Sequence, residues 1–223
     1  MEVLENLRSI FSDPRILSLW VGLVLFSLLL LLLDLLRANR QIQGLMRWVW
    51  ILTVAYSGPL GLAVYFYSGR RQISNDSIWR RGFRSVAHCY SGCGAGEMAG
   101  LLLTVGVLGL SGWWVAGITF LFAYLAGFGL TVGPLMQDGV ALGKASSDAF
   151  WSESASITIM EIVAIGVDLW LAGDAGPGNP LFWSSMLFSL SIGLLAAYPV
   201  NVLLIHFGVK EGMHDPRMAQ AGD

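Results

Sequence analysis

The sequence predicts an all-α fold: a polytopic helical membrane bundle of about six transmembrane helices, preceded by a short amphipathic interfacial helix. Of the 223 residues, 55% are hydrophobic and only 13% are charged, whereas soluble domains carry roughly 25% charged residues. Several apolar runs reach the roughly 18 to 20 residues that cross a bilayer. We therefore expect one transmembrane domain over residues 16–208, with an amphipathic segment over 1–15 and a polar tail over 209–223.

The apolar runs place the expected spans along the chain. The first run is too long for the apolar core of a signal peptide and lacks a small-residue cleavage site, so we expect it to remain as an anchor. The segment Ser57-Gly58-Pro59 should kink the second span, because proline removes a helical donor. The six spans are expected at 16–36, 46–67, 86–108, 113–132, 152–171 and 182–207.

The distribution of Lys and Arg predicts how these spans are oriented. If the N-terminus lies inside and six spans follow, ten basic residues lie on the inner side and three on the outer side. The positive-inside rule then puts both termini in the cytoplasm. The net charge of −2 gives no reason to expect nucleic acid as a partner.

The most distinctive chemical feature is a line of possible metal ligands at the start of the third span. Cys89, Cys93 and Glu97 follow one another at i, i+4 and i+8 on one helix face, with His88 on the neighbouring edge. Thiolate, imidazole and carboxylate suit soft and borderline metal ions. The pattern predicts binding of a soft metal ion, copper before others, for transport or delivery. The other interpretation is that the cysteines are small packing residues.

Acids within the predicted spans suggest a second function. Glu161 and Asp168 are seven residues apart in the fifth span, and Glu97 lies in the third. Ionisable groups at membrane depth are costly and usually functional. Together these acids could relay protons in a proton-coupled permease for a small solute, and Glu161 is the first candidate for a missing metal ligand. Further candidate residues near these acids are Met98, Met160, Asp138 and Lys144.

A third hypothesis is a non-catalytic subunit that packs against another membrane protein or a second copy. Gly92, Gly96 and Gly100 form a stripe of small residues at i, i+4 spacing, as in close helix pairs in membranes. A redox role for the two thiols is a weaker option. No nucleotide-binding loop, zinc-protease motif or serine-hydrolase elbow occurs in the sequence, so it identifies no enzyme class.

The segment from Ala87 to Glu97 resembles the His-Cys-x-x-Gly-Cys-x-x-Gly-Asp/Glu signature of the domain-of-unknown-function family 4396. Further landmarks are Lys144-Ala145-Ser146, Tyr198-Pro199-Val200-Asn201 and the segment 208–213, so the resemblance covers roughly residues 80–215. Ser146 stands where the family often has an acid. The resemblance implies a multi-span protein of a bacterial or archaeal cytoplasmic membrane, but no reaction.

Overall fold

A computed structural model describes residues 2–42, 44–213 and 215–218. Over these ranges the chain is helical, with no strand. Two short segments, η1 and η2, are π-helices that continue the helices before them. In chain order the elements are α1 (Glu2–Phe11), α2 (Pro14–Arg37), α3 (Gly44–Ser57), α4 (Pro59–Val64), η1 (Tyr65–Gly69), α5 (Ile78–Leu101), η2 (Leu102–Val107), α6 (Trp113–Gln137), α7 (Leu142–Ala172) and α8 (Pro180–His206).

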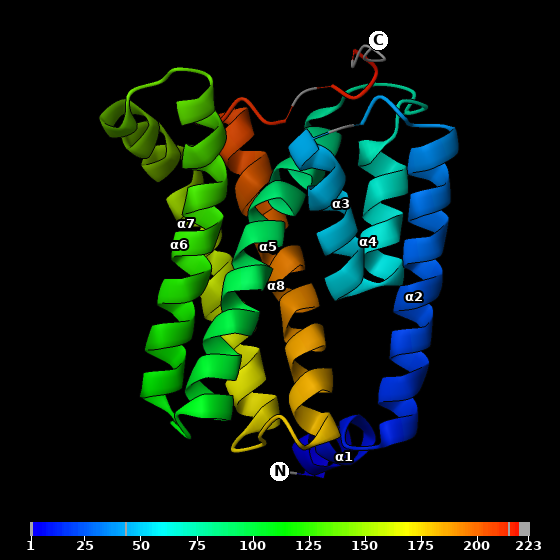
Figure 1. Cartoon of the computed structure of the whole chain (residues 1–223), viewed down its shortest axis with the longest axis vertical. Helices are drawn as coiled ribbons and strands as arrows, with labels where there is room; N and C mark the ends of the chain where they lie inside the picture. The colour runs from blue at the N-terminus through cyan, green and yellow to red at the C-terminus, as the bar shows by residue number, and fades with distance from the viewer. Residues whose placement is uncertain (1, 43, 214, 219–223) are drawn as a thin grey trace.

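Four helices are long and apolar enough to cross a membrane: α2, α6, α7 and α8. They run between the same two ends of the bundle, as does α5 continued by η2 (Figure 1). The first part of α5 is less apolar because it carries Arg80, Arg81 and Arg84. The all-α fold is therefore confirmed, and the four long apolar helices overlap spans predicted from the sequence.

The predicted second span is wrong, because residues 46–67 form a helical hairpin rather than one kinked helix. Figure 1 shows α3 and α4 side by side in one half of the bundle, with the connection between them near mid-height. Gly58 makes the reversal at φ +54° and ψ −123°, a conformation that favours glycine. The hairpin closes tightly, since a Cβ on Gly61 would lie 3.0 Å from Cα of Val54.

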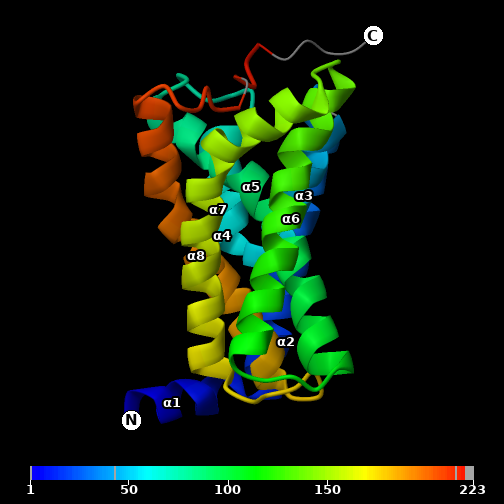
Figure 2. The ribbon, with the colours of Figure 1, turned by 90° about the vertical axis from the view of Figure 1, so that its left-hand side faces the viewer.

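The hairpin determines at which end of the bundle the later helices begin and finish. Because the hairpin returns to the end from which it started, the first and last described residues, Glu2 and Met218, lie at opposite ends of the bundle (Figure 1). The expectation that both termini lie on one side requires them to share an end. We call the end that contains α1 the N-terminal end and the opposite end the C-terminal end. Figure 2 shows α1 lying across the N-terminal end, where Arg8 donates to the carbonyl oxygens of Trp170 and Leu171, both at 3.0 Å.

The glycines of α5 are packed against α6 inside this chain. A Cβ on Gly92 would lie 3.0 Å from the carbonyl oxygen of Ala126, and one on Gly100 would lie 2.8 Å from Cα of Thr119. Such close approach of two backbones requires glycine. The glycine stripe, which the sequence offered as a surface for another subunit, is therefore covered by α6 of the same chain.

A test of this packing compares two glycines. Gly96→Ala should lower the stability by roughly 1–3 kcal/mol, because overpacking forces backbone shifts where the new Cβ would lie 2.6 Å from Cα of Ala123. Gly129→Ala on α6 meets open space and should change stability by less than about 0.5 kcal/mol. Thermal unfolding in detergent measures both, and equal melting temperatures would contradict the packing described.

Candidate functional site

Four carboxyl side chains are buried along the interior of the bundle. Glu153, Glu161 and Asp168 lie on α7, and Glu97 lies on α5; each is at most 4% exposed. Glu97 is close enough to Glu161 and Asp168 for their charges to act on it. From Glu153 to Asp168 the helix rises about 22 Å, at about 1.5 Å per residue. We call these four carboxyls the acidic row, and it extends through much of the bundle.

Three members of the acidic row have carboxyl oxygens without hydrogen-bond partners among the described residues. Both carboxyl oxygens of Glu97 and of Glu161, and Oδ1 of Asp168, have no hydrogen-bond partner among the described residues. An ionised carboxylate buried in this way is very unfavourable. Each of these groups must therefore hold a proton or pair with a cation that the fold itself does not supply.

The two thiols lie next to this row. Cys89 Sγ and Cys93 Sγ are 3.9 Å apart and buried, and Glu161 is the acid of α7 that lies near them, on the side of Cys93. Gly127 of α6 presses against Cys93, so the thiols are enclosed between α6 and α7. Glu161 thus lies near the cysteines. It belongs to α7, whereas the helix that packs against the glycines of α5 is α6.

His88 does not join the thiols. Its side chain lines a separate cavity of about 500 Å³ at the C-terminal end, which also contains Asp138, Glu153 and Lys210. Across the described residues, no three His, Cys, Asp or Glu side chains come together in a group that could hold a metal ion. The expected set of His88, Cys89, Cys93 and Glu97 is therefore not assembled as one site.

The remaining candidates are scattered. Met160 packs in the core against Gly193 of α8, and Met98 is half-buried beside the same core. Asp138 is exposed at the rim of the His88 cavity. Lys144 forms an exposed pair with Asp148, with Nζ 3.6 Å from Oδ2. The structure gives none of these four a place in the acidic row.

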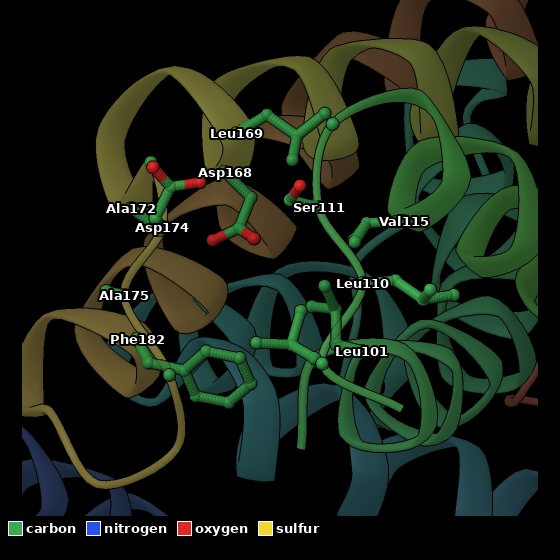
Figure 3. A pocket seen from close by; sticks show the side chains of 15 residues that line it. Leu101, Leu110, Ser111, Val115, Asp168, Leu169, Ala172, Asp174, Ala175 and Phe182 are labelled. Carbon is green, nitrogen blue, oxygen red and sulfur yellow. The ribbon is translucent and has the colours of Figure 1, made fainter. Parts of the chain in front are cut away.

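The acidic row meets a cavity at the N-terminal end. Figure 3 shows the carboxyl group of Asp168 pointing into a space bounded by Leu101, Ser111 and Phe182. This cavity has a volume of about 260 Å³ and also contains Asp174 in the loop after α7. Asp168 is therefore the member of the row nearest to this end.

At the C-terminal end the row finishes in a satisfied polar network. Lys210 Nζ lies 2.6 Å from Glu153 Oε2 and 3.1 Å from Asn201 Oδ1. Ser85 donates to the same amide oxygen at 2.9 Å, and the Asn201 amide donates to Ser156. Neither Glu153 nor Lys210 is among the site residues predicted from the sequence. The available signal was Glu153, an acid eight residues before Glu161 in the same helix.

The tail beyond this network carries its own ion pair. Arg217 donates to both carboxyl oxygens of Asp215, at 2.6 Å for the shortest contact. These hydrogen bonds lower the pKa of Asp215 below its ordinary value. Asp215 therefore keeps its negative charge at the rim of the C-terminal end.

Comparison with known proteins identifies a family match. The family model described as Domain of unknown function (DUF4396) matches residues 78–210, more than half of the chain. The matched range begins at α5 and ends at Lys210, so it contains the thiols, the acidic row and the network around Asn201. No curated protein and no solved structure gives a significant match.

Proposed function

The chain belongs to the DUF4396 family, and we propose that it is a membrane protein that moves protons along the acidic row, coupled to the transport of a small solute. The observation that carries this proposal is that Glu97 and Glu161, on the neighbouring helices α5 and α7, are both fully buried without hydrogen-bond partners among the described residues. Ionisable groups in such positions are typical of proton relays in pumps and transporters.

The position of the row within the bundle supports a path between the two ends. Asp168 opens toward the cavity at the N-terminal end, and Glu153 lies beside the His88 cavity at the C-terminal end. Two hydroxyl groups lie along the row: Ser185 is next to Asp168, and Ser156 lies on α7 between Glu153 and Glu161. Carboxyl and hydroxyl groups arranged one after another in space can transfer a proton from each group to the next.

The bundle itself suits a membrane. Apolar side chains of α2 face outward, including Leu25, Phe26 and Leu29. In this setting α3 and α4 are a re-entrant hairpin, which is tolerated at membrane depth where protein surrounds it. With the observed topology, all Lys and Arg except Arg8 and Arg15 belong to the C-terminal end. The positive-inside rule then places the C-terminal end in the cytoplasm and the N-terminus on the other side.

A second candidate function is binding of a soft metal ion, copper before others, for transport or delivery. The observation that favours it is the pair of reduced sulfurs 3.9 Å apart with Glu161 beside them. Thiolate pairs suit Cu(I) and Zn(II). In this version the two sulfurs are the ligands that the chain supplies, and His88 has no part in the site.

The proton pathway predicts a loss of flux in Glu161→Gln. In proteoliposomes with an internal pH dye and an imposed pH gradient, we expect the protein-dependent flux to fall roughly a hundredfold, as when a proton-transfer group is removed. Asp148→Asn, which removes an exposed acid on the same helix, should leave the flux unchanged. Wild-type flux in Glu161→Gln would refute the pathway.

The metal hypothesis predicts a different pattern. Protein purified under reducing conditions and incubated with Cu(I) should retain the metal, and Cys89→Ser/Cys93→Ser should lose it, as measured by elemental analysis. His88→Ala is the matched control and should retain the metal because His88 lines another cavity. Metal content near zero in all three proteins would rule this function out. Proton flux that survives loss of both thiols would favour the proton pathway.

The orientation is tested with reporters at the two termini. A C-terminal fluorescent protein that matures only in the cytoplasm should fluoresce, and an N-terminal fusion of a phosphatase active only outside should hydrolyse its substrate. This result follows from the odd number of crossings that the hairpin leaves, together with the basic C-terminal end. Both reporters indicating the same side of the membrane would contradict the orientation.

A further inference from the structure

After α8 the chain turns back over the C-terminal end of the bundle. Gly208 makes the turn at φ +70°, and the backbone amides of Val209 and Lys210 donate to the carbonyl oxygen of Leu204 at 3.0 and 3.2 Å. The buried guanidinium of Arg84 donates to the carbonyl oxygen of Met213 at 3.3 Å. Residues 208–213, which we call the tail strap, are thus fixed to both α8 and α5.

The tail strap inserts one charged side chain into the bundle. Lys210 is only 9% exposed, and its ammonium group is held by the Glu153 carboxylate and the Asn201 amide oxygen. Behind it lie Ser85 and Ser156, both fully buried. Ser156 precedes Glu161 by five residues on α7, so the ammonium group lies between the C-terminal end and the uncompensated part of the acidic row.

The side chain also borders the cavities at this end. Lys210 lines both the His88 cavity and a second cavity of about 500 Å³ on the other side of the tail strap. Several charged and titratable groups line these two spaces, whereas α3 and α8 contribute only apolar side chains to them. The charged and titratable groups are Asp76 before α5, Arg81 and His88 on α5, Asp138 after α6, Glu153 on α7, and Glu211 and Asp215 in the tail.

We propose that Lys210 is a tethered cation that closes the C-terminal entrance to the acidic row, and that the entrance opens when its ion pair with Glu153 is broken. A proton that reaches Glu153 removes the negative charge that holds the ammonium group. Lys210 can then move outward with the tail strap, because apart from the Arg84 contact to Met213 only turns and a few backbone hydrogen bonds fix that segment. The closed entrance keeps water away from Glu161 until a proton arrives.

That protons pass this entrance rests on the proposed function. Whether Lys210 closes the entrance can be measured without any assumption about transport. Ser156→Cys, made in the Cys89→Ser/Cys93→Ser background, places a single thiol directly behind Lys210. A charged methanethiosulfonate reagent should label this thiol slowly in the folded protein in detergent. Adding Lys210→Ala should accelerate labelling roughly tenfold or more, because losing a buried ion pair strongly favours local opening.

Matched variants separate the gate from a general loss of structure. Lys144→Ala removes the only other lysine of the chain, also paired with an acid on α7 but exposed, and should leave the rate unchanged. The exchange Lys210→Glu/Glu153→Lys should restore slow labelling by re-forming the pair. Melting temperatures and gel filtration check folding, and Glu153→Gln serves as the opening variant if Lys210→Ala does not fold.

The outcomes are distinct. Faster labelling in the Lys210 or Glu153 variant, reversed by the exchange, supports the gate. The same slow rate in a folded Lys210→Ala protein, or rapid labelling with Lys210 intact, overturns it. In proteoliposomes Lys210→Ala should also raise proton flux severalfold. If the wild-type protein shows no flux at all, the proposed function fails, while the labelling rates still decide whether Lys210 closes the entrance.

Discussion

The backbone contact between α5 and α6 is the constraint on which the rest of the interior depends. Gly92, Gly96 and Gly100 allow the two helices to approach until a single methyl group would collide. Apolar side chains gain little from leaving lipid, so contact of this kind and the dispersion forces it brings are what hold membrane helices together. Because the glycine face of α5 packs against α6, the thiols and Glu97 of α5 are buried in the interior, where α7 also packs.

The buried polar groups of the bundle fall into two classes with different consequences. At the C-terminal end, Lys210, Glu153 and Asn201 satisfy one another, and such a network stabilises a single arrangement when it is complete. Deeper inside, Glu97 and Glu161 are left without partners among the described residues. A fold that selection tuned only for stability would replace them with apolar residues, so their position is the strongest argument for a function in the interior.

The hairpin of α3 and α4 shows where hydropathy fails as a guide to topology. Residues 46–67 are mostly apolar, and a window average cannot distinguish one kinked helix from two half-length helices that run in opposite directions. The local signal was present in Ser57-Gly58-Pro59, yet a proline after glycine fits a kink as well as a reversal. Only the positive φ of Gly58 and the contact of Gly61 with Val54 decide between them.

The sequence by itself determined the helical class, the long apolar helices and the alignment of Cys89, Cys93 and Glu97, because helix spacing and hydrophobicity are local properties. It also located the buried acids of α7. Tertiary structure alone decided that α6 covers the glycines, that His88 lines a different cavity from the thiols, and that Lys210 reaches Glu153 from 57 residues away. These are contacts between distant segments, and they depend on which helices pack together, which no local pattern specifies.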